Sequence, residues 1–191
     1  MSLESKDILV RVMETPNPLA IKLVVNFPLK NEGKVSVTEK KQVDNFPLLE
    51  ELFGIAGVYQ LHIFENQVSL SHDGKLSFDE ISKQAEQVIK KWGDKHDPSF
   101  QLEEEKVKKK KRDNLSEEEC KIEEILDRTI RPGLQADGGD LEVVSFKGNK
   151  VEISYQGACG GCPSSYMETL FTIENILRYE LGNDKIEVYP I

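Results

Sequence analysis

The sequence predicts an α+β chain made of two small domains joined by a charged linker. Three observations support this class. The chain has 191 residues, enough for two modest cores. Strand-like alternation and helix-like apolar spacing both occur in each half. A run of charged residues without apolar partners separates the halves. We therefore expect one domain at 1–97, a linker at 98–115 and a second domain at 116–191.

In the first domain, alternating apolar and polar residues predict strands. The expected strands are 8–13, 20–25, 34–37, 58–64 and 68–71. The segment Thr15-Pro16-Asn17-Pro18 predicts a rigid turn, because each proline fixes φ and removes a backbone donor. A short helix is expected at 46–53. A longer helix follows Ser77, because Glu80 three residues later completes a capping box.

The expected linker is recognised by its charge pattern. Pro98 breaks the chain, and the acidic run Glu103-Glu104-Glu105 then meets the basic run from Lys108 to Arg112. Blocks of charge that have no apolar face are typical of solvated linkers.

The second domain shows sharper signals. Ser116 and Glu119 form another capping box, and the helix that follows is expected to end at Pro132-Gly133. Further elements are strands at 141–146 and 151–155 with a turn at Gly148-Asn149, a helix from Pro163 to Leu181, and a last strand at 185–189. The strand–helix–strand passage at the end predicts that the last two strands are parallel.

Composition excludes several classes of function. A net charge of −9 argues against nucleic acid as the main partner, and no apolar run reaches the length of a membrane span. The first residues lack the pattern of a secretory signal, and three cysteines are too few for a disulfide framework. We expect a reducing compartment: the cytoplasm, or the mitochondrial matrix if a transit peptide has been removed.

The motif Cys159-Gly160-Gly161-Cys162 is the strongest functional signal. Two thiolates at this spacing converge on one metal ion or cluster, and the glycines let the backbone approach the sulfurs. A zinc or thiolate-bound cluster site wants four ligands, and this domain offers these two. Two chains supply four, which favours an iron–sulfur cluster shared by two copies. A thiol–disulfide oxidoreductase and a zinc-bridged dimeric interaction module remain the alternatives.

Longer motifs in both halves are similar to one family. In the second half they are Arg131-Pro132, Asp137-Gly138-Gly139-Asp140 and Gly157-Ala158-Cys159-Gly160-Gly161-Cys162-Pro163-Ser164-Ser165. They resemble the C-terminal NifU-like domain of Nfu-type iron–sulfur carriers. Glu14-Thr15-Pro16-Asn17-Pro18, Lys22 and the stretch 48–58 resemble the Nfu N-terminal domain.

The resemblance implies a non-enzymatic role. It implies a [4Fe–4S] cluster held by Cys159 and Cys162 of two protomers, a homodimer formed through the cluster, and transfer to apo iron–sulfur client proteins. It also implies upstream assembly proteins as partners, while the expectation of neither nucleic acid nor a membrane as partner comes from the charge and the apolar runs.

Other reactive side chains receive ordinary interpretations. Cys120 is expected to be a surface thiol, because it falls away from the apolar face of its helix. Asp137 and Asp140 are expected to be turn residues that bond their own backbone. His62 is interpreted as a plain strand residue. Tyr166 and Met167 fit helix packing, and shielding of a cluster from water is the other role that their position allows.

Overall fold

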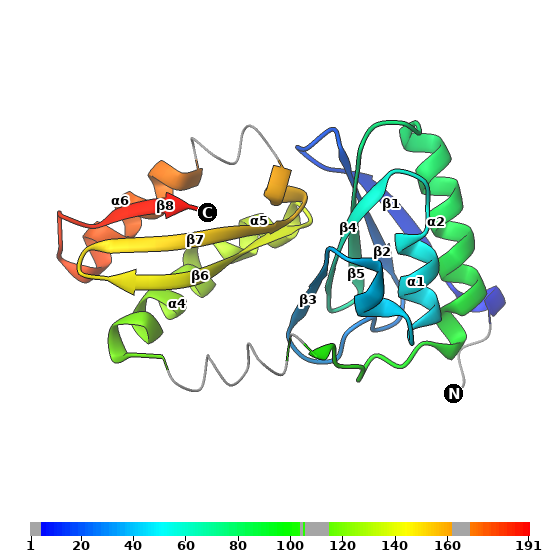
Figure 1. Cartoon of the computed structure of the whole chain (residues 1–191), viewed down its shortest axis with the longest axis horizontal. Helices are drawn as coiled ribbons and strands as arrows, with labels where there is room; N and C mark the ends of the chain where they lie inside the picture. Colours follow the sequence, from blue (N-terminus) through cyan, green and yellow to red (C-terminus); the bar gives the residue numbers. More distant parts are fainter. Residues whose placement is uncertain (1–4, 104, 106–114, 162–168) are drawn as a thin grey trace.

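A computed structural model describes residues 5–103, 105, 115–161 and 169–191 of the chain (Figure 1). Helices and sheets are mixed in both halves, which confirms the α+β class. The described residues form one sheet of five strands and one of three, each with its own buried apolar cluster.

The N-terminal sheet has the strand order β1-β2-β5-β4-β3, and all neighbours are antiparallel. Its strands are β1 (Val10–Glu14), β2 (Ala20–Val25), β3 (Lys34–Val37), β4 (Val58–Phe64) and β5 (Gln67–His72). Helices α1 (Pro47–Phe53) and α2 (Phe78–Trp92) cover one face of this sheet (Figure 1). Leu23, Leu61 and Leu70 are fully buried there.

The opposite face of the same sheet is polar. The strand register aligns Lys22 with Ser69, Ser69 with His62, and His62 with Ser36. Because side chains alternate along a strand, these four residues share the face turned away from α1 and α2. We call them the polar row. Lys22, Ser69 and His62 are nevertheless buried, so another part of the molecule must cover them.

The N-terminal core also takes in part of the expected linker. Phe100 and Leu102 are buried in the first apolar cluster, although the surrounding sequence is charged. Lys30 contacts both the carbonyl of Phe100 and the carboxylate of Glu105. The basic run from Lys108 to Arg112 lies outside the described residues. The described residues of this half also form the 3-10 turns η1 (Ser5–Asp7), η2 (Lys40–Val43) and η3 (Gly93–Lys95).

The C-terminal half folds around the sheet β6-β7-β8. Its elements are α4 (Glu117–Thr129), α5 (Arg131–Ala136), β6 (Gly139–Lys147), β7 (Lys150–Gly157), the 3-10 turn η4 (Ala158–Gly161), α6 (Leu170–Leu181) and β8 (Glu187–Pro190). Strands β6 and β7 form the expected hairpin, and β7 and β8 are parallel as predicted. Ile122, Leu126, Ile153 and Leu177 are fully buried between the helices and the sheet.

Local signals placed most helix ends well. Both capping boxes are present, at Ser77 and at Ser116. Gly182 ends α6 in the left-handed conformation, with φ 60°. One expectation was wrong: the helix that begins after Ser116 does not run to Pro132. It ends at Thr129, and Pro132 lies in the first turn of a second helix, α5, where its missing N–H costs nothing.

The expected start of the last helix, at Pro163, lies outside the described residues. No helix in the described part of the chain is long and apolar enough to span a bilayer.

Candidate metal centre

Cys159 lies in η4, directly after the end of β7. Its side chain is 4% exposed and belongs to the C-terminal apolar cluster. The thiol packs against the Cα of Gly139 at the start of β6. A Cβ added at Gly139 would overlap the sulfur and would lie 2.8 Å from the Cys159 Cβ. Gly139 therefore makes room for the thiol, as the predicted close approach of backbone and sulfur requires.

The neighbouring glycines set the path of the backbone. Gly138 has φ 82° and Gly157 has φ 59°, conformations that L side chains rarely adopt. We call η4 the cysteine turn. The amide of Ala158 donates to the carbonyl of Gly138 at 3.1 Å, which joins the cysteine turn to the Asp-Gly-Gly-Asp loop at 137–140. The two loops thus form one unit. The two glycines of that loop have different roles: Gly138 adopts a positive φ, and Gly139 leaves room for the Cys159 sulfur.

Cys162, Tyr166 and Met167 lie outside the described residues, so their predicted roles stay predictions. Within the described ranges, no group of three or more His, Cys, Asp or Glu side chains could hold a metal ion. Cys120 is exposed, as expected for a surface thiol.

The covering of the polar row is the feature that sequence reasoning missed. The loops around Cys159 lie against this face of the N-terminal sheet, on the side opposite α1 and α2 (Figure 1). A Cβ at Gly138 would lie 2.5 Å from the Ser69 hydroxyl, and one at Gly157 would lie 2.9 Å from His62. His62 is therefore not a plain strand residue, because it packs against the chain two positions before Cys159.

Asn17 joins the Thr15-Pro18 turn to the cysteine turn. Its side chain is buried, and Nδ2 donates to the carbonyl of Ala158 at 2.9 Å. The Asn17 Oδ1 accepts from the amide of Leu19 at 3.0 Å, so its orientation is fixed inside its own turn. The Thr15 hydroxyl donates to the carbonyl of Asn17 at 2.8 Å. The expected turn is present and is held by these internal bonds, and in addition it contacts the residue before Cys159.

Lys22 makes a second link between the halves. Its ammonium group donates to the carbonyls of Ala136, at 2.8 Å, and Gln135, at 3.2 Å. These carbonyls end α5, where a cation is favoured by the helix dipole. Burial lowers the pKa of Lys22, and the charge of Asp137 opposes this change.

Asp140 makes the third link, which corrects its interpretation as a simple turn residue. Its carboxylate does accept from the amide of Leu141, but it is fully buried and lies 2.6 Å from the Lys34 ammonium. Arg131 lies 3.4 Å from the same oxygen. Burial raises the pKa of Asp140, whereas Lys34 and the hydrogen bonds from Gln135 and Leu141 outweigh it and hold the pKa below its ordinary value.

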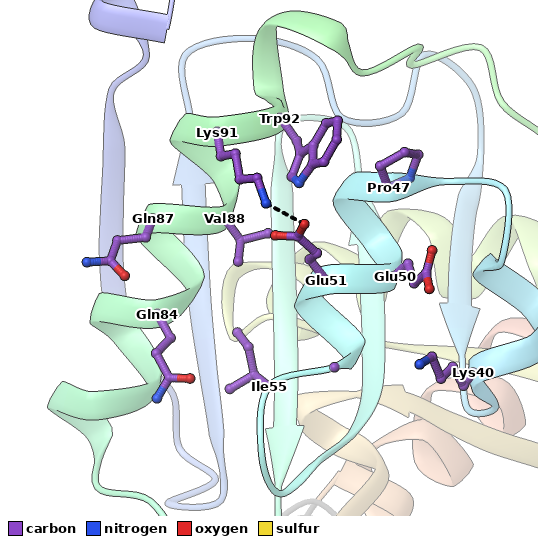
Figure 2. Close-up of a pocket in the computed structure, with 11 residues that line it drawn as sticks. Lys40, Pro47, Glu50, Glu51, Ile55, Gln84, Gln87, Val88, Lys91 and Trp92 are labelled. Atoms are coloured by element: carbon purple, nitrogen blue, oxygen red, sulfur yellow. Dashed lines mark hydrogen bonds and ion pairs between the residues drawn. The ribbon is translucent and has the colours of Figure 1, made fainter.

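A separate groove lies between α1 and α2, away from the cysteine turn (Figure 2). Its volume is about 750 Å³, and Lys91 crosses it to contact Glu51 at 2.6 Å. Its lining mixes glutamines, charges and the edges of Val88 and Trp92. Nothing in this lining resembles a metal site.

Two family matches agree with the geometry. Residues 10–96 match the family described as scaffold protein Nfu/NifU N terminal, and residues 122–188 match the NifU-like domain. The chain is therefore a two-domain scaffold protein of the NifU-like class. It belongs to the Nfu-type family of iron–sulfur cluster scaffolds, as its motifs predicted.

Curated relatives match along nearly the whole chain. NifU-like protein 5, mitochondrial, of Arabidopsis thaliana is 26% identical over 187 residues, covering 95% of this chain and 68% of the relative. The NFU1 iron-sulfur cluster scaffold homolog, mitochondrial, of Drosophila persimilis is 24% identical over 179 residues, covering 93% of this chain and 64% of the relative. The chain thus spans about two thirds of the length of these relatives.

Among solved structures, the NMR structure of a NifU-like protein from Saccharomyces cerevisiae aligns with a TM-score of 0.40 and 16% identity. The alignment covers 44% of the present chain and 76% of the yeast protein's chain.

Proposed function

We propose that this protein carries a [4Fe–4S] cluster as cargo, bound by Cys159 and Cys162 of two copies, and passes it to apo-proteins. The observation that carries the proposal is the built environment of Cys159. Cys159 lies two residues after the end of β7 and its thiol rests on Gly139, within a turn that begins and ends in small residues. Thiolate ligands suit an iron–sulfur cluster, and two copies complete a set of four.

The names of the relatives point the same way. The Drosophila persimilis protein is named as an iron–sulfur cluster scaffold homolog. A scaffold does not hold its cluster permanently, so a site completed by two chains suits the role: separating the chains halves the ligand set and frees the cluster. The proposed partners are therefore a second copy, upstream assembly proteins and apo iron–sulfur clients. The role is that of a carrier and not of a catalyst.

The relatives are also named as mitochondrial proteins. This supports the mitochondrial matrix over the cytoplasm as the place where the protein acts. Fractionation of cells that express the full-length gene product, followed by immunoblotting, tests this proposal.

The decisive experiment is anaerobic reconstitution of the full chain with iron and sulfide. We expect a broad visible thiolate-to-iron absorption, and an iron and sulfide content of four each per two chains. Sedimentation should show that the coloured species is a dimer. Cys159→Ala and Cys162→Ala should each abolish uptake, whereas Cys120→Ala, the matched control on the exposed face of α4, should not. Uptake that survives both site variants would refute the proposal.

The two alternatives predict other results. A thiol–disulfide oxidoreductase needs a reactive thiol that substrates can reach, and Cys159 is 4% exposed. Turnover of a disulfide substrate would nevertheless revive that alternative. A zinc-bridged dimer would be colourless, and metal analysis of protein purified without oxygen distinguishes it from the cluster-bound form.

A further inference from the structure

The polar face of the N-terminal sheet contacts both loops that surround Cys159. Asn17 bonds the carbonyl of Ala158 in η4, and Lys22 bonds the carbonyls that end α5. The Gln60 side chain lies 3.5 Å from the position of a Cβ on Gly160. The Tyr59 hydroxyl lies at the same distance, 3.5 Å, from the corresponding position on Gly161. The cysteine turn is therefore flanked on both sides of Cys159 by residues of the other domain.

We propose that this polar face is a docking surface for the cysteine turn of its own chain, and that two copies must release the turn before they can share a cluster. The inference rests on the proposed two-copy cluster site. It gives a task to the Thr15-Pro16-Asn17-Pro18 turn and to Lys22, which the carrier function alone leaves without one.

The buried polar groups show that the contact is built for docking. Asn17 is 2% exposed and Lys22 is 7% exposed, and each has partners across the interface at hydrogen-bonding distance. Burying an amide or an ammonium is costly unless such partners are present. In the docked state the side chains of Asn17 and Lys22 are satisfied by these hydrogen bonds. In the undocked state water satisfies the same groups.

The same chemistry makes the contact reversible. The links across the interface run from polar side chains to main-chain carbonyls and to Asp140, while the two apolar clusters stay separate. Polar interfaces between domains resemble transient protein–protein contacts more than cores. Opening therefore exposes little apolar surface and leaves both domains folded.

Docking and cluster sharing compete for the same turn. Ligands from two chains must reach the same cluster through direct metal–sulfur bonds, so the two cysteine turns must come close together. In the docked chain, Asn17 and the side chains of Tyr59 and Gln60 occupy the space beside η4. These side chains therefore take up part of the space that a second copy would need beside η4. Release of η4 frees the turn and also exposes the polar row.

Alkylation of the cluster-free full chain tests the proposal. Iodoacetamide labelling of Cys159 is followed by mass spectrometry, with the exposed Cys120 of the same molecule as an internal reference. The test variant combines Asn17→Ala with Lys22→Met, which keeps the apolar stem of the lysine. Loss of two of the three links between the halves should speed labelling of Cys159 about tenfold and leave Cys120 unchanged. Lys75→Met, at a lysine whose side chain is 78% exposed, is the matched control and should change neither rate.

Unfolding is excluded by circular dichroism and by an unchanged thermal midpoint for each domain. X-ray scattering gives a second readout, because the double variant should have a larger radius of gyration than the wild-type chain. If Cys159 is labelled at the wild-type rate in the double variant, Asn17 and Lys22 do not hold the cysteine turn against the N-terminal sheet and the proposal is wrong. Equal labelling of Cys159 and Cys120 in the wild-type chain would also overturn it.

Reconstitution separates this inference from the carrier function. If the double variant binds its cluster and dimerises faster than the wild-type chain, both proposals stand. If Cys159→Ala still takes up the cluster, the carrier proposal fails. The labelling rates of Cys159 still test the docking proposal independently. Equal rates of cluster-dependent dimerisation in the double variant and the wild-type chain would overturn the competition between docking and sharing.

Discussion

The ammonium group of Lys34 lies 2.6 Å from the carboxylate of Asp140, and the two residues are contributed by different domains. Asp140 is fully buried, and the Lys34 side chain is 18% exposed. Lys34 also donates to the carbonyl of Leu141 at 3.0 Å. Removing either member of this partly buried ion pair is costly, because the change leaves the other charge or the Leu141 carbonyl without its partner.

A double-mutant cycle should detect this coupling. Lys34→Met and Asp140→Asn are each expected to destabilise the chain in urea, and the double variant should be less destabilised than the sum of the two. We expect a coupling free energy of about 2 kcal/mol, below the value for a fully buried pair, because Arg131 remains beside Asp140. Lys75→Met, which removes a solvated lysine, provides the baseline. Additive effects would show that the pair does not form in solution.

Stability should also fall with acid in a way that depends on Asp140. Burial raises the pKa of this carboxylate, but Lys34 and the hydrogen-bond donors around it lower the pKa more. The pKa of Asp140 in the folded chain therefore lies below the ordinary value. Its ionised form therefore stabilises the fold at any pH above the ordinary aspartate range, about 3.9. That contribution is lost as pH falls from the ordinary pKa through the lower folded value. Arg131, paired with Glu123 and Asp127 of α4, is the other charged group facing this carboxylate.

Urea unfolding of the wild-type chain and Asp140→Asn between pH 7 and pH 3 measures the effect. The difference in unfolding free energy between them should shrink as the pH falls below about 4. The same difference at every pH would mean that Asp140 does not titrate differently in the folded chain.

Gly139→Ala should damage the candidate metal centre, because the new methyl group would overlap the Cys159 sulfur and lie 2.8 Å from the amide of Cys159. We expect a loss of about 2 kcal/mol in stability and a marked fall in cluster uptake. Gly133→Ala is the matched control: nothing lies within 4 Å of its added Cβ, and it falls inside α5. Alanine there should be neutral or slightly stabilising. Normal uptake by Gly139→Ala would mean that the thiol moves away from Gly139 when the cluster binds.

Local structure was predictable because its signals are short in sequence. Ser77 and Ser116 each predict the start of a helix, because a glutamate three residues later completes a capping box. Both capping boxes are present in the structure. The hairpin turn at Gly148 follows from one residue that adopts φ 66°. The Cys159–Cys162 pair suggested a metal centre for the same reason, because the cysteines and their glycines are adjacent in the sequence, and its ligand role stays a prediction.

The interface between the halves was not predictable from such signals. The Asn17–Ala158 bond joins residues 141 positions apart, and no periodicity marks either end. Lys22 has the polarity of a surface residue and is buried only because a second domain covers it. Phe100 and Leu102 were missed differently: two apolar residues beside a run of charges give no pattern, although both complete the N-terminal core.

The two capping boxes offer a test of whether the halves are separate folding units, as the sequence predicts. Each box has the same chemistry. Ser77 Oγ accepts from the amide of Glu80 at 3.3 Å, and Ser116 Oγ accepts from the amide of Glu119 at 3.2 Å. Replacing either serine by alanine should cost its own domain about 1 kcal/mol. The chain has one tryptophan, Trp92, at the end of α2, so fluorescence reports the N-terminal domain alone.

Ser77→Ala should therefore shift the Trp92 fluorescence transition in urea to lower concentration. Ser116→Ala should leave that transition in place and move only the remaining transition seen by far-ultraviolet circular dichroism. The prediction follows from the two separate apolar clusters, each of which can unfold without breaking the other. Equal shifts of the Trp92 transition in both variants would instead show that the polar interface makes the two domains unfold as one unit.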